Sequence, residues 1–400
     1  MSVIEIPSTW TTLEPTLRRE KLRELAASAR LVRAPEGLMV LRWDDVRGLL
    51  RDRRFSGVGL AVFDVLGIGD GPLRRWYGSL MFTNEGAVHH RLRSLVQQAF
   101  VPRSVEALRP TAAAFADELL RPVAAAGHGD LVDLAFHLPI RTMARLIGIP
   151  DAHVSDLTGW SKSLGPVFGF MAPEQIDAAA NAIVDMLEYT KSVLAQRRTD
   201  PKDDLVTRLL DAEEGGERLT DDEVADMVVN LVAGGHDTST GQIACTLLTM
   251  LEHPDVLATV RADPTLVPAA VEESLRYIAA IGVVPRVVLE TFEYEGLQFS
   301  AGELVLLSTD TANHDPLGYS EPGRFLPQRF AADDVHRLMT FGAGSHYCLG
   351  AALARMVLEE SVAAVLRLPE PLTLAEPAGA IPWVTVLGTY PGRLPITCGP

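Results

Sequence analysis

Residues 341–350 read FGAGSHYCLG, and the interpretation of the whole chain starts from this stretch. Cys348 lies on a glycine-rich loop directly before the helix-like run AALARMVLEESVAAVL. Unsatisfied backbone N–H groups and the positive end of a helix dipole both favour a thiolate over a thiol. The glycines allow positive φ and close approach to a flat ligand, and Phe341 and Leu349 supply an apolar wall. The loop therefore predicts a sulfur ligand presented to a buried metal.

The alternative for Cys348 is a small core hydrophobe, the usual fate of a lone cysteine. The spacing Phe-Gly-x-Gly-x-His-x-Cys-x-Gly argues against it, because it resembles the haem-binding loop of the cytochromes P450, the haem-thiolate monooxygenases. The resemblance implies haem b (iron protoporphyrin IX) as the cofactor and Cys348 as its metal ligand. It also implies Phe341, Gly342 and Gly350 as cofactor-binding residues.

The composition predicts a single, mostly helical domain over residues 1–400. With 47% hydrophobic residues the chain can bury a large core, and no linker, charge block or repeat divides it. Alanine-rich helical runs dominate, while strand-like runs gather near residues 31–42, near residues 286–307 and at the C-terminus. The expected class is mainly α with a small β-rich part. The resemblance implies the cytochrome P450 fold, a triangular prism with haem between the long central helix and the Cys348 loop.

The net charge and the number of cysteines limit which partners and which cellular location we expect. The net charge of −16 argues against nucleic acid or an anionic membrane as a partner. No apolar run approaches the length of a membrane span, so we expect neither a membrane anchor nor a signal peptide. The three cysteines are too few and odd in number for a disulfide framework, which favours a reducing, cytoplasmic location. The chain is expected to act as a monomer.

A long helix with an unusual middle precedes the Cys348 loop by about 110 residues. Thr220 and Glu223 form a capping-box pattern, and the helix can run to about His253, before a proline. Its interior contains the paired glycines Gly234 and Gly235, which each cost about 1 kcal/mol in a helix. A nearby Thr can also bond to a preceding carbonyl, so we expect a local opening and a groove in the helix wall.

The groove segment resembles the distal oxygen-binding groove of the cytochromes P450. The resemblance implies two catalytic residues: Thr238 anchors oxygen and water, and Asp237 relays the protons that dioxygen reduction consumes. Ala233, one turn earlier, is implied as a cofactor-binding residue. The simpler alternative is that Asp and Thr beside glycines mark a helix end or turn. We do not expect His236 to be a ligand, since a second protein ligand would block the oxygen site.

Burying the two propionates of haem requires cationic or hydrogen-bonding partners. His89 and Arg93 are four residues apart and share one helix face. By resemblance to the family's His-x-x-x-Arg helix they bind propionates, as do Arg286 after a strand entry and His346 within the Cys348 loop. Each of the four could equally be a solvated basic residue.

A second charged group is expected to support the scaffold. Glu273 and Arg276 are three residues apart and can pair on one helical turn. The resemblance to the family's Glu-x-x-Arg signature implies a buried network with an arginine from a later segment, which we assign to Arg324 of EPGRF. Without the resemblance, the simpler alternative is an exposed Glu–Arg ion pair, which contributes under about 1 kcal/mol to the free energy of unfolding.

The function implied by the resemblance is a monooxygenase that hydroxylates or epoxidises an apolar small molecule with dioxygen and two electrons. The residues carry no flavin or nicotinamide fingerprint, so a ferredoxin and its reductase are the expected electron donors. Residues 86–103 contain Arg91, Arg93 and Arg103 and no carboxylate. An acidic ferredoxin could be steered to this basic patch, although an ordinary solvated helix face is an equal alternative.

Candidate walls of the substrate pocket, by resemblance, lie in residues 60–69 with Phe82, in residues 165–171, at Val232 and Ala233, and in residues 281–284. Such apolar stretches are more often plain core, and they do not choose among terpenoid, steroid, fatty acid and polyketide. Three rival functions remain open: a peroxygenase, a haem-based gas sensor or carrier, and a structural zinc protein.

Overall fold

The structure is a computed structural model that describes residues 4–169, 171–331 and 338–399. Contacts divide the chain into two compact units. Unit 1 comprises Met1–Val58 and Asp255–Cys348, and unit 2 comprises Gly59–Pro254 and Leu349–Pro400. Each unit combines two segments that are far apart in the sequence, so neither is an independent stretch of chain. The single domain expected over residues 1–400 stays a prediction.

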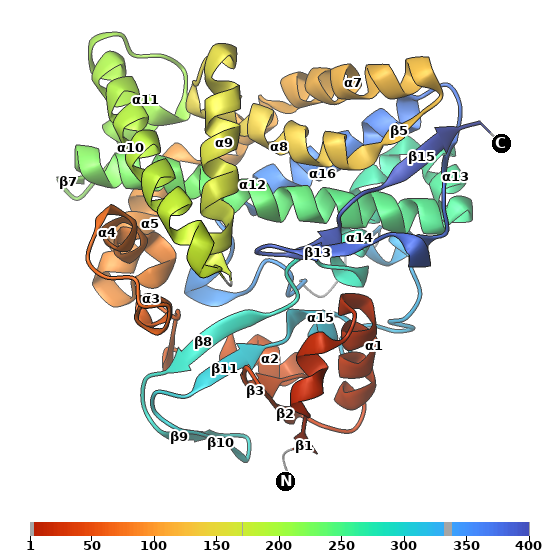
Figure 1. Cartoon of the computed structure of the whole chain (residues 1–400), viewed down its shortest axis with the longest axis horizontal. Coiled ribbons are helices and arrows are strands. Elements are labelled where there is room, and N and C mark those ends of the chain that lie inside the picture. Colours follow the sequence, from red (N-terminus) through yellow and green to blue (C-terminus); the bar gives the residue numbers. More distant parts are fainter. Residues whose placement is uncertain (1–3, 170, 332–337, 400) are drawn as a thin grey trace. The chain divides into compact units, whose positions relative to one another are not determined.

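Unit 1 is built on a six-stranded mixed sheet with strand order β1-β2-β3-β11-β8-β4. Figure 1 labels β1, β2, β3, β11 and β8 of this sheet. Strand β3 pairs in parallel with β11, with Leu38 opposite Val305, and β11 pairs antiparallel with β8. The strands of this sheet are β1 (Ile4–Glu5), β2 (Leu31–Ala34), β3 (Gly37–Val40), β4 (Phe55–Ser56), β8 (Val284–Val288) and β11 (Leu304–Leu307). A separate two-stranded sheet is formed by β9 (Phe292–Tyr294) and β10 (Leu297–Phe299). The helices are α1 (Pro15–Ala26), α2 (Trp43–Leu49), α13 (Pro254–Ala262), α14 (Val267–Tyr277) and α15 (Thr309–Asn313).

Helix α1 covers part of this sheet. Its buried Leu22 and Ala26 join a core cluster with Val32 of β2 and Met39 of β3, together with the aromatic ring of Trp10. Three of the four residues in β2 and three of the four in β3 are buried, so both strands lie in the interior of unit 1. The predicted strand runs near residues 31–42 and 286–307 are therefore confirmed.

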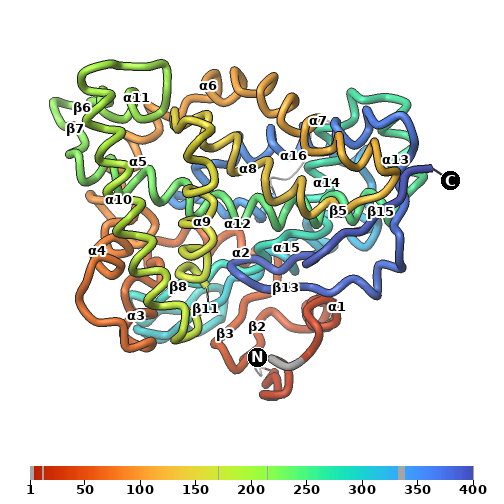
Figure 2. The backbone as a smooth tube through the Cα atoms, turned by 45° about the horizontal axis from the view of Figure 1, so that its top comes forward, coloured from red at the N-terminus to blue at the C-terminus, as the bar shows by residue number. Residues whose placement is uncertain are grey.

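Unit 2 is mainly helical and is organised around α12 (Asp221–Glu252), which packs against α8, α9, α10 and α16 (Figure 2). Its other helices are α3 (Ala61–Val65), α4 (Pro72–Ser79), α5 (Gly86–Ala99), α6 (Pro102–Glu106), α7 (Arg109–Ala126), α8 (Leu131–Ile147), α9 (Val154–Leu164), α10 (Ile176–Thr199), α11 (Leu205–Asp211) and α16 (Ala351–Arg367). Its strands are β5 (His128–Asp130), β6 (Glu213–Glu214), β7 (Glu217–Arg218), β12 (Leu372–Leu374), β13 (Trp383–Thr385), β14 (Thr389–Pro391) and β15 (Pro395–Cys398). The expectation of a mainly α protein with a smaller β part is confirmed.

The predicted capping box starts α12. The Glu223 N–H donates to Thr220 Oγ1 at 3.2 Å, and the Thr220 N–H donates to Glu223 Oε2 at 2.9 Å. From Thr240 to Met250 every residue of α12 is buried, which is the burial expected for a helix at the centre of a core. In the described part of the chain no single helix has both the length and the apolar character of a membrane span. One bent pair, α12 with α13, meets those criteria by length and composition only.

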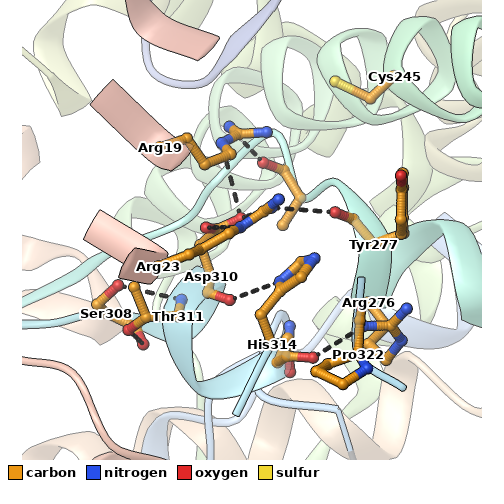
Figure 3. Close-up of polar contacts among 12 residues, drawn as sticks. Arg19, Arg23, Cys245, Arg276, Tyr277, Ser308, Asp310, Thr311, His314 and Pro322 are labelled. Carbon is orange, nitrogen blue, oxygen red and sulfur yellow. Dashed lines mark hydrogen bonds and ion pairs between the residues drawn. The ribbon is translucent and has the colours of Figure 1, made fainter. Parts of the chain in front are cut away.

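A buried carboxylate links α1 to the C-terminal part of unit 1 (Figure 3). Arg23 of α1 donates two hydrogen bonds to Asp310 of α15, at 3.0 and 2.9 Å, and Arg19 lies 3.6 Å from the same carboxylate. Burial disfavours the charge on Asp310, but the two arginines outweigh that effect and lower its pKa below the usual range. His314 donates from Nδ1 to the Asp310 carbonyl at 3.0 Å. This group therefore joins segments almost 300 residues apart.

The predicted scaffold network is present, but one of its members is different. Glu273 and Arg276 are fully buried and joined by two hydrogen bonds of 2.8 Å. The second arginine on Glu273 is Arg329, whose Nε lies 3.3 Å from the carboxylate and whose side chain is 10% exposed. The assignment of Arg324 was wrong, because its side chain is 64% exposed and pairs with Glu321. Arg324 contributes only its carbonyl, which accepts a hydrogen bond from Arg276.

Removing the Arg329 side chain should destabilise the fold much more than removing that of Arg324. An Arg329→Ala variant leaves a buried carboxylate short of a partner and should lose about 3 kcal/mol of unfolding free energy. An Arg324→Ala variant should lose less than about 0.5 kcal/mol, since only an exposed pair is lost. Denaturant unfolding of both variants measures the difference, and equal losses would contradict the network described here.

His314 should make unit 1 sensitive to acid. Burial, and then the charge of Arg23, lower its pKa to about 3. In the described part of the chain its Nε2 has no hydrogen-bond partner. Between about pH 6 and about pH 4 the unfolded chain binds a proton at this residue and the folded chain does not, so stability falls as pH falls. Wild type should lose up to about 1 kcal/mol more per pH unit than His314→Gln in denaturant unfolding at several pH values. Parallel pH profiles would rule this contribution out.

Candidate active site

Residues 341–348 form a loop that is closed by its own backbone. The Cys348 N–H donates to the Phe341 carbonyl at 2.9 Å, and a turn is closed inside the loop between Tyr347 and Gly344 at 3.2 Å. Gly342 and Gly344 have φ of +69° and +72°, values that residues with a Cβ rarely adopt. Cys348 is exposed at the end of the loop. The sulfur is therefore presented from a fixed backbone.

The chain just before this loop is fixed by a buried asparagine, Asn313 of α15. Its Oδ1 accepts a hydrogen bond from the Met339 N–H at 3.0 Å, and its Nδ2 donates to Thr340 Oγ1 at 2.8 Å. The Thr340 hydroxyl in turn donates to the Leu275 carbonyl of α14 at 2.7 Å. The two helices that hold the Glu273–Arg276 pair thus also determine where Phe341 and the loop begin.

Steric space gives a second reason for a glycine in the loop. A Cβ on Gly344 would lie 3.0 Å from the Leu50 carbonyl oxygen and 3.2 Å from the Arg51 Cα. The close approach of this backbone to the end of α2 holds the loop from its other side. An exposed sulfur on such a loop, which also carries the half-buried Phe341, fits the donor that a haem-thiolate site requires.

Unit 1 brings four of the predicted site residues into one segment. Phe341, Gly342, His346 and Cys348 all lie in the loop, His346 at the end of the 3-10 helix η8 (Gly344–His346). The fifth, Arg286, lies on β8 opposite Val305 of β11 and is partly buried.

The remaining predicted residues belong to unit 2. His89 and Arg93 follow one another on one face of α5, His89 buried and Arg93 half-buried. Gly350 is the N-cap residue of α16, and its carbonyl accepts the first hydrogen bond of that helix, from Ala354 at 2.9 Å. Ala233 is fully buried in α12.

Helix α12 runs without interruption through the segment where we expected a local opening, so the predicted break is absent. The back-bond expected from the threonine is present: Thr238 Oγ1 donates to the Gly234 carbonyl at 2.9 Å. Gly235 has a steric role, because a Cβ there would lie 2.7 Å from Met143 Cε of α8. The glycine lets α8 and α12 approach closely, and helix regularity is kept despite its low helix propensity.

Asp237 is held by the C-terminal hairpin, a contact that sequence reasoning missed. Its Oδ1 accepts a hydrogen bond from the Tyr390 hydroxyl at 2.8 Å, and its Oδ2 accepts from the Leu387 and Gly388 N–H groups at 3.1 and 3.4 Å. The partners lie 150 or more residues along the chain. No local pattern in the sequence could have indicated this pairing.

His236 is a structural residue, as expected. Its Nδ1 lies 3.0 Å from Ser161 Oγ of α9, and its Nε2 lies 2.9 Å from the Phe136 carbonyl of α8. Burial lowers the pKa of His236, which favours the neutral ring. Both ring nitrogens are used in joining α12 to its neighbours.

Two of the expected pocket walls meet in an aromatic cluster of unit 2. The ring of Tyr77 lies 4.6 Å from Phe63, 5.6 Å from Phe82 and 6.2 Å from Phe168, measured between centroids. Phe82 and Phe168 also contact each other at 5.7 Å. Burial raises the pKa of Tyr77 to about 12. Phe170, within the same predicted wall, lies outside the described residues.

Comparisons with known proteins agree with the Cys348 motif. The family model described as Cytochrome P450 matches residues 164–368. Cytochrome P450 107B1 of Saccharopolyspora erythraea is 34% identical over 380 residues, which cover 92% of this chain and 91% of the relative. The mycinamicin IV hydroxylase/epoxidase of Micromonospora griseorubida is 33% identical, covering 87% and 86%. The crystal structure of CalO2 matches with a TM-score of 0.90 and 32% identity over 100% of both chains.

Three findings together assign the chain to a family: the family model covers half of the chain, the relatives are more than 30% identical, and the Cys348 loop is present. The family implies a haem cofactor, and the named relatives include hydroxylases and epoxidases. The chain belongs to the cytochrome P450 family and is a cytochrome P450 monooxygenase.

Proposed function

We propose that this monooxygenase inserts one oxygen atom of dioxygen into a C–H or C=C bond of an apolar small molecule. For hydroxylation the balance is RH + O₂ + 2H⁺ + 2e⁻ → ROH + H₂O, so the chain has to supply protons and accept electrons. The observation that supports the proposal is the exposed Cys348 thiol on its closed loop. When bound, haem b supplies the dioxygen chemistry, and a thiolate ligand donates electron density that favours O–O cleavage.

The roles of the cofactor-binding residues follow from their chemistry. His89, Arg93, Arg286 and His346 would provide charge or hydrogen bonds to the propionates, which need such partners when buried. Phe341, Gly342, Gly350 and Ala233 would offer apolar or side-chain-free surface to the flat ring. Gly342 with its positive φ and the fully buried Ala233 support these roles.

Proton supply is assigned to neighbours on α12. The Thr238 hydroxyl is held by the Gly234 carbonyl, which leaves its lone pairs to accept a hydrogen bond from a water. The Asp237 carboxylate can take a proton from solvent and pass it on. These two residues are proposed to deliver the two protons of the balance above, which a peroxygenase would not require.

The substrate is proposed to be an apolar molecule. The aromatic cluster of Phe63, Tyr77, Phe82 and Phe168 supports a lipophilic ligand, since such rings bury large areas. A relative is named for both hydroxylation and epoxidation of mycinamicin IV, so either outcome is within the proposal.

A ferredoxin is proposed as the electron donor. The expected basic patch is less basic than its sequence indicates, because Arg91 forms ion pairs with Glu223 and, at 3.8 Å, with Glu217. Arg103 is exposed, and we propose that its charge attracts an acidic ferredoxin to this surface.

Replacing Cys348 by Ser should remove thiolate ligation, because a hydroxyl is a poor donor to haem iron. The absorption spectrum of the reduced carbon monoxide complex reports that ligand. Cys398→Ser is the matched control, since Cys398 lies on β15 with its sulfur 3.9 Å from the Val123 carbonyl. The thiolate spectrum should vanish in the first variant and persist in the second. A Cys348→Ser protein with the wild-type spectrum would refute the proposed ligand.

Replacing Thr238 by Ala should divert reducing equivalents to hydrogen peroxide while haem binding stays intact. We expect the peroxide fraction to rise roughly tenfold, as for loss of a positioned proton-transfer group. Thr249→Ala is the matched control, because Thr249 makes the same back-bond on α12, to the Cys245 carbonyl at 2.8 Å. Thr238→Ser should restore coupling. Unchanged coupling in Thr238→Ala would remove this residue from proton supply.

A further inference from the structure

The carboxylate of Asp237 is fully engaged by one short segment of chain. Tyr390 lies on β14, and Leu387 and Gly388 lie in the turn between β13 and β14. Their hydroxyl and two N–H groups donate to both oxygens of the carboxylate. Hydrogen bonds to a charged carboxylate are among the stronger ones in proteins. Asp237 thus has a preferred position, which its own helix does not determine.

The turn that holds Asp237 is itself confined. A hydrogen bond from the Val386 N–H to the Gly388 carbonyl closes it at 3.0 Å. On its other side a Cβ on Gly169 would lie 2.8 Å from the Val386 carbonyl oxygen, and a Cβ on Gly165 would lie 3.6 Å from Val386 Cγ1. The turn therefore lies between α12 and residues 165–169 of the same unit, with little room to move.

Tyr390 is suited to act as a permanent donor. Its side chain is 8% exposed in a site where its hydroxyl reaches Asp237. Burial, and then the neighbouring carboxylate, raise the pKa of Tyr390 well above the usual range. The hydroxyl stays protonated at all physiological pH values and cannot become a base. Its chemistry is limited to giving or withdrawing one hydrogen bond.

Thr238 differs from its neighbour in this respect. Its hydroxyl is oriented by the Gly234 carbonyl within α12. The helix alone can hold the alcohol, whereas the acid depends on a partner from the end of the chain. The hairpin can therefore affect proton supply without touching Thr238.

We propose that Tyr390 is a positioning residue for Asp237: its hydroxyl holds the carboxylate against the β13–β14 turn and determines how the carboxylate is oriented for proton transfer. The inference rests on the relay role proposed above for Asp237. In the transfer, a proton from solvent binds Oδ1 in place of the Tyr390 hydrogen bond. The carboxylic acid then gives that proton to the oxygen being reduced and returns to Tyr390 as a carboxylate. No electron moves through either residue.

The test compares Tyr390→Phe with Asp237→Asn in the holoenzyme. Tyr390→Phe keeps the buried ring and removes only the hydroxyl. Tyr319→Phe is the matched control, because Tyr319 is 3% exposed and its hydroxyl does not bond to Asp237. Electrons are supplied by a plant-type ferredoxin with its NADPH reductase. The substrate probe is whichever lipophile gives the largest spin-state change in a panel of terpenoids, steroids, fatty acids and polyketides.

The first readout is hydrogen exchange at the Leu387 and Gly388 amides, which needs no turnover. Loss of one hydrogen bond of about 1 kcal/mol should raise exchange about fivefold in Tyr390→Phe, and leave it unchanged in Tyr319→Phe. The second readout is the peroxide fraction, which should rise several-fold in Tyr390→Phe toward the Asp237→Asn value. The dissociation constant of the probe should stay within twofold of wild type.

Each outcome decides the inference. Faster exchange with unchanged peroxide would make the Tyr390 contact purely structural and overturn the inference alone. Unchanged exchange would show that the hydroxyl does not hold the turn, with the same result. If Asp237→Asn itself leaves the peroxide fraction unchanged, the relay role of the proposed function fails, and this inference fails with it. Raised exchange together with a raised peroxide fraction supports both.

Discussion

The segments of unit 1 that lead to the Cys348 loop are held by one buried cation, the guanidinium of Arg276. It is inaccessible to solvent, and it makes five hydrogen bonds, two to Glu273 and one each to the carbonyls of Asn313, Pro322 and Arg324. A charge in this position is tolerated only because all five N–H donors are satisfied. Three of these hydrogen bonds go to backbone carbonyls, so they fix the position of three separate places in the chain. One of them, Asn313, extends the constraint through its side chain to the residues that open the Cys348 loop.

The central helix of unit 2, α12, has two roles. It is a core element, and it carries the two residues that we propose for proton supply. In α12 every residue from Thr240 to Met250 is buried, as packing at the centre of a core requires. In the preceding turn, both ring nitrogens of His236 form hydrogen bonds with neighbouring helices, and Gly235 lets α8 pack closely against α12. The next two residues, Asp237 and Thr238, carry the carboxylate and the hydroxyl that we propose for proton supply. Residues that pack α12 against its neighbours and the two residues proposed for chemistry therefore lie next to each other along one helix.

The sequence predicted features whose cause is local, and it failed where the cause is distant. The capping box at Thr220, the back-bond of Thr238 and the strand runs each follow from neighbours within a few residues, and all are confirmed. Arg324 was mistaken for Arg329 because both are plausible in the same segment, and only the fold distinguishes a side chain from a carbonyl as partner. The expected break in α12 is absent because packing through Gly235 outweighs helix propensity. The hairpin on Asp237 has no local signature at all.

The parallel pairing of β3 with β11 has a consequence for how the protein is made. Leu38 and Val305 are opposite each other, so the sheet cannot close until almost 270 residues have followed β3 out of the ribosome. At about 5–20 residues per second this takes roughly 15 to 50 seconds. During that interval the edge of β3 that later pairs with β11 is unpaired, and such an edge attracts other strands. Biogenesis of unit 1 therefore depends on delayed, long-range closure, the kind of topology that folds slowly and benefits from chaperones.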